Sequence, residues 1–251
     1  ELRLKKTILV GGLKKRARDL SGIVNAVLFL PQDLALVEGP PSARRHYLDA
    51  TICQVDSTYC KALSEYSKVL PQRNALLKEL QHRDASGIRQ LEFWDETLCR
   101  CGGVMIARRS RAIEEIEQYA IPLYEQLSEG VEHLRLDYRP SYDPIDKTSD
   151  QLSLALDVPV KRGRLTEAEI SAGLRERLHT MRSDEILRGM TMVGPHRDEL
   201  RFINSGVDLG MYGSRGQARS AVLALKLAEM AWMRDRSGEW PVLLLDEVLA
   251  E

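Results

Sequence analysis

Three absences limit what this chain can be. It has no run of apolar residues near the roughly 18 that a membrane-spanning helix needs, and its first residues show no signal-peptide pattern. It also contains no Gly-x-x-x-x-Gly-Lys-Ser/Thr sequence, the loop that cradles nucleotide phosphates in many ATPases. The sequence therefore indicates neither a membrane protein nor a complete phosphate-loop enzyme.

Charge and cysteine content further limit the kinds of binding site that the sequence can form. The 36 lysines and arginines are balanced by 37 aspartates and glutamates, so any surface that attracts nucleic acid must be local. The cysteines show no Cys-x-x-Cys spacing, which argues against a structural zinc site. Because they fall in segments with a helical pattern, we interpret them as reduced thiols of a cytoplasmic protein. They are Cys53, Cys60, Cys99 and Cys101.

The length and the two ends of the chain favour a fragment with two parts. A chain of 251 residues with 43% hydrophobic side chains can bury a sizeable core, and single domains usually have about 100–200 residues. The chain begins at Glu1 rather than at a methionine, and it ends at Glu251 directly after a strand pattern. We therefore expect a piece of a longer protein that contains two subdomains.

Hydrophobic periodicity predicts an α/β (α+β) fold in which a helical lobe interrupts a sheet. From 42 to 130 the apolar residues follow a helical spacing, with few glycines or prolines. A capping box at Thr166 and Glu169 predicts a further helix. Strand patterns occupy residues 2–10, 25–30, 131–138, 200–203 and 242–245.

Two apolar seams in the helical stretch predict an antiparallel helical hairpin. A polar turn at 83–87 separates the seams, and Arg73 and Arg108 are their respective polar members. Pro71 and Pro122 are expected to bend the two helices, because proline removes an N–H and crowds the preceding turn. The seams comprise Tyr59, Leu63, Tyr66, Leu70, Leu77 and Leu80, then Leu91, Trp94, Leu98, Cys101, Met105, Ala112, Ile116, Tyr119, Leu123 and Leu127.

Two motifs near the end of the chain indicate nucleotide chemistry. Ser214 and Gln217 belong to a Ser-x-Gly-Gln sequence that opens a long apolar-periodic helix, where free N–H groups and the helix dipole suit a phosphate oxygen. Four aliphatic residues at 242–245 then precede Asp246 and Glu247. This pattern predicts a buried strand that delivers two carboxylates to its C-terminal edge, where α/β proteins place their ligands.

Five ordered stretches of the chain resemble the SMC-like branch of the ABC-type ATPases. They are residues 29–34, 39–49, 72–77, 194–198 and 213–251. The resemblance implies a partial ABC-type ATPase lobe joined to a large helical lobe. It places the first part of the ATPase lobe in residues 1–38, the helical lobe in 39–190, and the signature helix and acidic strand in 191–251.

The same resemblance implies roles for individual residues. Gln32 would be the Q-loop residue that senses the metal and the attacking water, and Asp246 would hold Mg²⁺ through its water shell. Glu247 would be the general base. Ser214, Gly216 and Gln217 would contact the γ-phosphate of an ATP molecule held by a second copy of the protein.

At the level of function, the resemblance implies a DNA-binding ATPase of replication, repair and recombination. ATP would join two copies on DNA near single-strand/double-strand junctions, and the protein would help mediator proteins load recombinase at single-strand gaps. Recognition would be of the DNA backbone and shape. The intact protein is expected to hydrolyse ATP slowly, and this chain alone is expected to be inactive because it has no phosphate loop.

Basic clusters are the candidate DNA contacts, although each is also compatible with an ordinary solvated surface. One is the run Lys14, Lys15 and Arg16, and another includes Arg108 and Arg109. A Gly-Pro-His-Arg-Asp sequence at 194–198 is ambiguous, because a histidine in a turn can be either structural or functional.

Three alternatives stay open. Another SMC-like repair ATPase is disfavoured, because the predicted hairpin arms of about 25–40 residues are too short for a long coiled coil. A non-catalytic interaction module is disfavoured because both Asp246 and Glu247 are present. The ATPase subunit of a membrane transporter is disfavoured by the size of the helical insertion.

Overall fold

The structure is a computed structural model that describes residues 7–15, 22–81, 88–130, 132–143 and 162–246. Its helices and strands match the mixed α/β class predicted from the sequence. Within the described ranges, no helix is both long enough and apolar enough to cross a membrane.

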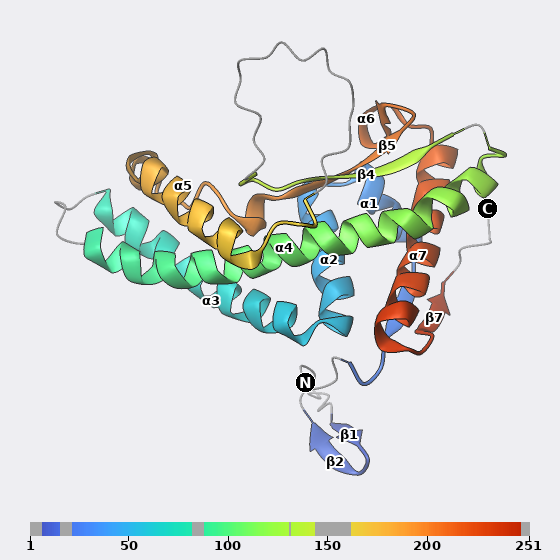
Figure 1. Cartoon of the computed structure of the whole chain (residues 1–251), viewed down its shortest axis with the longest axis horizontal. Coiled ribbons are helices and arrows are strands. Elements are labelled where there is room, and N and C mark those ends of the chain that lie inside the picture. Colours follow the sequence, from blue (N-terminus) through green and yellow to red (C-terminus); the bar gives the residue numbers. More distant parts are fainter. Residues whose placement is uncertain (1–6, 16–21, 82–87, 131, 144–161, 247–251) are drawn as a thin grey trace, which may run out of the picture.

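The predicted helical hairpin is present. Helix α3 (Ser57–Leu80) packs along the 40-residue helix α4 (Ile88–Leu127), and the two run antiparallel (Figure 1). Asp56 caps α3 by accepting hydrogen bonds from the backbone N–H groups of Thr58 and Tyr59 at 2.9 and 3.0 Å. Both helices continue past the prolines within them, so neither is broken there.

Helix α4 is the central element of the fold. It contacts α3 on one side, α5 (Glu167–Arg188) on another, and α7 (Arg215–Ser237) near its C-terminal half (Figure 1). Helix α5 begins at the capping box predicted from the sequence, with Thr166 and Glu169 bonding each other's backbone N–H. Helix α2 (Pro41–Val55) packs against α3, α4 and α7.

A buried arginine joins the two arms of the hairpin to α5. Arg73, the predicted polar member of the first seam, is fully buried and donates to Asp95 and Glu185, each at 2.6 Å. It also donates to the Thr191 hydroxyl at 2.9 Å. Two carboxylates and a hydroxyl therefore compensate this buried guanidinium.

The strands of the described residues form three small sheets. Strand β4 (Leu134–Arg139) pairs antiparallel with β5 (Glu199–Asn204), which continues into β6 (Val207–Asp208). Strands β1 (Ile8–Val10) and β2 (Leu13–Lys15) form a hairpin that projects from the body (Figure 1). The part of the chain that the structure describes also contains the 3-10 helices η2 (Pro31–Leu34) and η4 (Pro195–Arg197) and the short helices α1 (Ala35–Glu38) and α6 (Leu209–Tyr212).

The third sheet is a parallel pair that carries the candidate site. Strand β3 (Ala26–Phe29) pairs with β7 (Val242–Leu245), and α7 packs against β3. The expectation that β7 is buried is wrong for this structure, because its four side chains are 37 to 59% exposed. Among the described residues, β3 is the only strand that pairs with β7, so its other edge and outer face stay uncovered.

Candidate functional site

Gln32 and Asp246 lie at the same edge of the parallel pair. Phe29, the last residue of β3, is in register with Leu245, the last residue of β7. Gln32 follows three residues later in η2, and the backbone N–H of Asp246 donates to the Phe29 carbonyl at 3.1 Å. Both side chains are exposed. Two neighbouring parallel strands thus present an amide and a carboxylate beyond their carboxyl ends, where α/β sheets bind ligands.

The segment that carries Gln32 is fixed by its neighbour Asp33. The Asp33 carboxylate accepts from the Leu30 N–H at 2.8 Å, which closes the turn that η2 makes. It also lies 3.6 Å from Nζ of Lys226, a buried lysine of α7 that is 3.8 Å from Glu229. Helix α7, the signature helix expected from the sequence, is therefore joined to the Gln32 segment by a largely buried ion-pair network.

Burial has the largest effect on the pKa of Glu229, one of the carboxylates in that network. It raises the pKa of Glu229, while the nearby Lys226 ammonium acts in the opposite direction. The Thr51 hydroxyl donates to Glu229 at 2.7 Å, and Nζ of Lys226 lies 4.9 Å from the centre of the Tyr47 ring. Sequence reasoning missed the roles of Lys226 and Asp33, because a single charged residue on the apolar face of α7 carries no pattern and Asp33 is distant from it in the sequence.

Ser214 and Gln217 form a reciprocal cap at the start of α7. The Ser214 hydroxyl oxygen accepts from the Gln217 backbone N–H at 3.2 Å, and the Gln217 side-chain oxygen accepts from the Ser214 N–H at 2.9 Å. Ser214 and Gly216 are exposed, and a Cβ added at Gly216 would have the Ser214 hydroxyl oxygen, at 3.8 Å, as its nearest contact beyond the adjoining helix backbone. The helix N-terminus is consequently open to an anion approaching along its axis.

The oxygen atoms at this sheet edge suit Mg²⁺. Carboxylate and amide oxygens, together with phosphates and waters, are the ligands that Mg²⁺ takes in nucleotide sites. Among the residues described, no group of three or more His, Cys, Asp or Glu side chains could hold a metal by itself. Glu247, the predicted general base, lies outside the described residues.

The candidate DNA contacts fall into different environments. Lys14 and Lys15 are exposed on β2, whereas Arg16 lies outside the described residues. Arg108 is 31% exposed and pairs with Glu167 at 2.9 Å and Asp56 at 3.4 Å. Among the described members of these clusters, Lys14 and Lys15 are therefore more exposed than Arg108.

The prediction that Arg109 contacts DNA is corrected by its burial. Its side chain is 1% exposed, and its N–H groups donate to Tyr59, Pro195, Asp198 and Asp49 at 2.7 to 2.9 Å. A buried guanidinium that is already engaged in this way cannot reach a phosphate on the surface. Arg109, not Arg108, is also the inward-facing member of the second seam.

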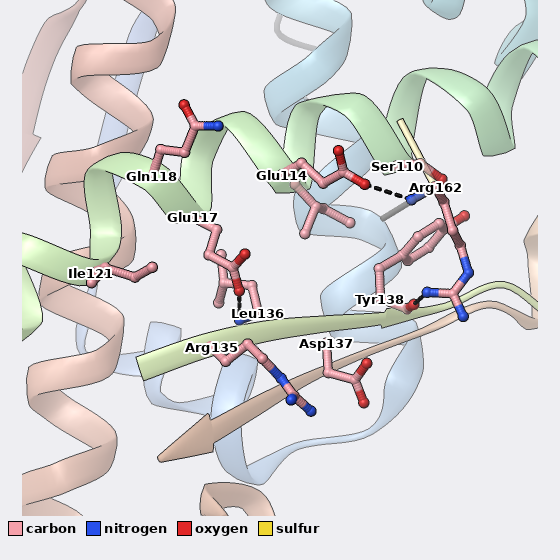
Figure 2. A pocket seen from close by; sticks show the side chains of 11 residues that line it. Ser110, Glu114, Glu117, Gln118, Ile121, Arg135, Leu136, Asp137, Tyr138 and Arg162 are labelled. Atoms are coloured by element: carbon pink, nitrogen blue, oxygen red, sulfur yellow. Dashed lines mark hydrogen bonds between the residues drawn. The ribbon is translucent and has the colours of Figure 1, made fainter. Parts of the chain in front are cut away.

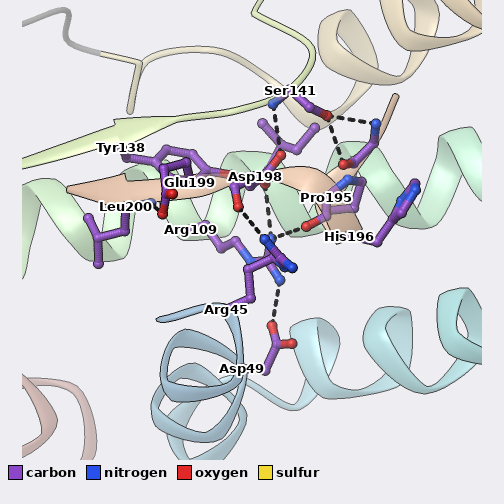
Figure 3. Close-up of polar contacts among 12 residues, drawn as sticks. Arg45, Asp49, Arg109, Tyr138, Ser141, Pro195, His196, Asp198, Glu199 and Leu200 are labelled. Atoms are coloured by element: carbon purple, nitrogen blue, oxygen red, sulfur yellow. Dashed lines mark hydrogen bonds and ion pairs between the residues drawn. The ribbon is translucent and has the colours of Figure 1, made fainter. Parts of the chain in front are cut away.

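Arg109 belongs to a buried polar network centred on Asp198 (Figure 3). The Asp198 carboxylate accepts from Arg109 at 2.9 Å, from the Ser141 N–H at 2.9 Å and from the Tyr138 hydroxyl. Complete burial raises the pKa of Asp198, and Arg109 opposes that shift. Asp49 completes the network from α2 by pairing with Arg109 at 2.7 Å. The network joins the hairpin to β4 and β5.

His196 has a structural environment in this fold. Its Nδ1 lies 2.7 Å from the Tyr66 hydroxyl, and its Nε2 lies 3.3 Å from the Thr191 carbonyl, which makes Nε2 the protonated nitrogen. Burial lowers the pKa of His196 to about 4. The neighbouring Arg197 donates to the Thr191 carbonyl at 2.9 Å. The side chains of His196 and Arg197 therefore both bind the Thr191 carbonyl and hold the chain in place there.

A cavity of about 270 Å³ lies between α4 and β4, with Arg162 also in its lining (Figure 2). Two of its carboxylates bind backbone groups. Glu117 accepts from the Leu136 N–H at 2.7 Å, and Glu114 accepts from the N–H groups of Arg162 and Gly163 at 2.6 and 2.8 Å. Burial raises the pKa of Glu117. These contacts fix β4 and the start of the 162–165 segment against α4.

The chain is similar to curated bacterial proteins over nearly its whole length. It is 43% identical over 257 residues to the DNA replication and repair protein RecF of Chloroflexus aurantiacus, covering 98% of this chain and 59% of that protein. It is 40% identical to RecF of Roseiflexus castenholzii with the same coverage. The chain thus spans about three fifths of the length of these relatives. No family model matches it.

Solved structures show the same likeness. A structure of the recombination mediator protein RecF with ATPrS, from the RecFOR pathway, superposes with a TM-score of 0.84 at 32% sequence identity. The corresponding structure of RecF with ATP gives a TM-score of 0.82. Each comparison covers 98% of this chain and 61% of the solved chain.

Proposed function

Because this chain belongs to the RecF family of DNA replication and repair proteins, we propose that it forms part of an ATP-dependent, dimerising DNA-binding ATPase. ATP holds two copies together on DNA, and hydrolysis releases them. The protein acts in the cytoplasm at single-strand/double-strand junctions, where it helps mediator proteins load recombinase at gaps.

The placement of Gln32 and Asp246 at one sheet edge is the observation that carries this proposal. Asp246 would hold Mg²⁺ through its water shell, and Gln32 would sense both the metal and the attacking water. Glu247, the next residue along the chain, would act as the general base. Mg²⁺ would supply neutralisation of the charge that develops on the phosphate oxygens.

The open N-terminus of α7 supports a role in joining two copies. Ser214 and Gly216 are exposed at the helix end, so their polar groups are available to a γ-phosphate held by a second copy, whereas the N–H of Gln217 is engaged by the Ser214 hydroxyl oxygen. The hydroxyl oxygen of Ser214 already accepts from Gln217, which leaves its proton for a phosphate oxygen. The sites for ATP are thus shared between the two copies.

The DNA-binding part of the proposal rests mainly on the exposed Lys14 and Lys15. Lys14 and Lys15 on the projecting hairpin, with Arg16 next to them, are suited to the phosphate backbone, and Arg108 could contribute from α4. Arg109 is excluded because its guanidinium is buried.

A pair of N-cap substitutions tests the proposal in a full-length RecF-family protein that carries this chain and a phosphate loop. Ser214→Asp keeps a good N-cap but places a carboxylate where the γ-phosphate would bind. Thr166→Asp makes the corresponding change at the cap of α5 and is the matched control. We expect ATP-dependent self-association, measured by sedimentation, to be lost in Ser214→Asp and kept in Thr166→Asp.

The thermal stability of Ser214→Asp should stay close to that of the unmodified protein, since aspartate caps helices about as well as serine. Thr166→Asp should be the less stable of the two variants, because its carboxylate would lie beside that of Glu169. If Ser214→Asp still self-associates with ATP like the unmodified protein, the shared nucleotide site is refuted. That result would favour a non-catalytic interaction module instead.

A further inference from the structure

The side-chain amide of Gln217 is held at both of its ends. Its oxygen accepts from the Ser214 N–H at 2.9 Å, and its nitrogen donates to Oε1 of Glu132 at 2.6 Å. Glu132 is 85 residues away in the sequence, in the segment that leads into β4. The cap that Ser214 and Gln217 form at the start of α7 therefore has a hydrogen-bond partner from a distant part of the chain.

Glu132 gathers donors from more than one element. Its second oxygen, Oε2, accepts from the Tyr124 hydroxyl of α4 at 2.8 Å. The hydrogen bonds from Gln217 and Tyr124 lower the pKa of Glu132. The carboxyl group is consequently ionised near neutral pH and can only accept hydrogen bonds.

An ionised Glu132 determines which way the Gln217 amide faces. A carboxylate cannot donate, so Gln217 must present its NH₂ group to Glu132 and its oxygen to the Ser214 N–H. The reversed orientation would bring two donors together at Ser214 and two acceptors together at Glu132. Glu132 thereby selects the orientation in which the reciprocal cap can form.

The cap in turn determines what Ser214 can offer a ligand. With its oxygen accepting from the Gln217 N–H at 3.2 Å, the hydroxyl has its proton left to donate. Among the described residues, no acceptor for that proton is found, and Ser214 is exposed. The hydroxyl can then donate outward from the helix N-terminus to an anionic oxygen.

We propose that Glu132 is a positioning residue for the signature motif, the Ser-x-Gly-Gln sequence at 214–217. Glu132 orients Gln217, and through Gln217 it orients the Ser214 hydroxyl for the γ-phosphate of a second copy's ATP. This inference rests on the proposed function, because it assigns no separate ligand to Glu132. Through Tyr124, the same carboxylate ties the C-terminal end of α4 to the signature motif.

The test measures ATP-dependent self-association of a full-length RecF-family protein that carries this chain and a phosphate loop. Glu132→Ala should raise the ATP concentration for half-maximal association about tenfold, as expected for the loss of a charge-assisted hydrogen bond. Glu132→Gln should recover only part of this loss, because its amide oxygen can still accept from Gln217 but its NH₂ group no longer excludes the reversed orientation. Glu125→Ala removes a nearby carboxylate that binds His133 instead, and should change the value less than twofold.

A double-mutant cycle shows whether Glu132 acts through Gln217. In a Gln217→Ala background, Glu132→Ala should have almost no further effect on the ATP concentration required. An equal effect in both backgrounds would overturn the proposal. So would a Glu132→Ala protein that matches Glu125→Ala, or a Glu132→Gln protein as impaired as Glu132→Ala.

The Ser214→Asp variant separates this inference from the function on which it rests. If Ser214→Asp abolishes association but Glu132→Ala does not weaken it, the nucleotide role stands and the role of Glu132 is refuted. If Ser214→Asp associates normally, the shared ATP site itself fails. Melting temperatures of all variants identify a purely structural effect, which would lower stability without changing the ATP requirement.

Discussion

Arg109 and Asp198 form an ion pair with 2.9 Å between Nη1 and Oδ2, although 89 residues separate them and each side chain is 1% exposed. The pair joins α4 to the turn that precedes β5. Asp198 also accepts from Tyr138 and Ser141, and Arg109 also donates to Asp49. Because these further bonds satisfy both charges, the pair can persist in the core, and removal of one partner leaves the other uncompensated.

We therefore expect Arg109→Met to reduce the free energy of unfolding by about 3–5 kcal/mol. Arg100→Met is the matched control, because Arg100 pairs with Glu65 on the surface, where the two side chains are 57 and 46% exposed. That substitution should cost less than about 1 kcal/mol. Urea unfolding of the two variants checks the difference, and equal losses would contradict a structural role for Arg109.

His196 should make the protein less stable in mild acid. Its pKa is about 4 in the folded protein because of burial, whereas an unfolded histidine titrates near pH 6.5. Between these values the unfolded chain binds a proton that the folded chain does not, so a falling pH favours unfolding. We expect this group to remove about 3 kcal/mol of stability between pH 7 and pH 4.

His196→Gln isolates that contribution, because glutamine does not titrate but can still accept a hydrogen bond from Tyr66. Urea unfolding across this pH range should show a shallower loss of stability for the variant than for the unmodified chain. His179→Gln replaces an exposed histidine of α5 and serves as the matched control variant. Identical pH profiles for His196→Gln and the unmodified chain would rule out this interpretation.

The ion-pair network at Lys226 should matter for stability as well. Lys226→Met leaves the Asp33 and Glu229 carboxylates without their shared cation, and we expect a loss of about 3 kcal/mol. Adding Glu229→Gln should restore part of that loss, because it removes one of the uncompensated charges. Lys61→Met, at an exposed position of α3, is the control. Thermal and urea unfolding measure all three, and a loss no larger than that of Lys61→Met would argue against the network.

The sequence predicts the hairpin correctly but not which arginine faces its interior. Met105 and Ala112 lie on the inner face of the helix, and either Arg108 or Arg109 could be the residue between them on that face. Both choices combine a spacing of three residues with one of four. Burial of Arg109 depends on Asp198, which lies 89 residues further along the chain. Local spacing carries no information about that distant carboxylate.

The strand patterns likewise predict where strands lie but not which strands pair or what covers them. The aliphatic run at 242–245 and the run at 25–30 locate β7 and β3, yet neither pattern shows that the two strands pair in parallel. The exposure of β7 was not predictable either, because an apolar run indicates what a strand could bury and not what covers it. Glu132 was missed because one glutamate before a strand is unremarkable until the fold brings Gln217 beside it.

The exposed lysines of the β1–β2 hairpin give a prediction for DNA binding. Lys14 and Lys15 are consecutive in β2, so their side chains point to opposite faces of the ribbon. A duplex lying against one face would contact only one of them. Charge reversal of that lysine should weaken duplex binding and make the salt dependence shallower by about 0.9 in log–log slope, the value for one lost phosphate contact.

Lys14→Glu and Lys15→Glu should therefore differ, with one variant close to the unmodified protein in slope. Lys61→Glu changes the net charge equally on α3 and serves as the control for non-local electrostatics. Duplex affinity measured between low and moderate salt concentrations in the full-length protein distinguishes the cases. If both hairpin variants keep the slope of Lys61→Glu, the hairpin does not bind the backbone; if both lose about 0.9, the ribbon enters a groove and contacts phosphates on both faces.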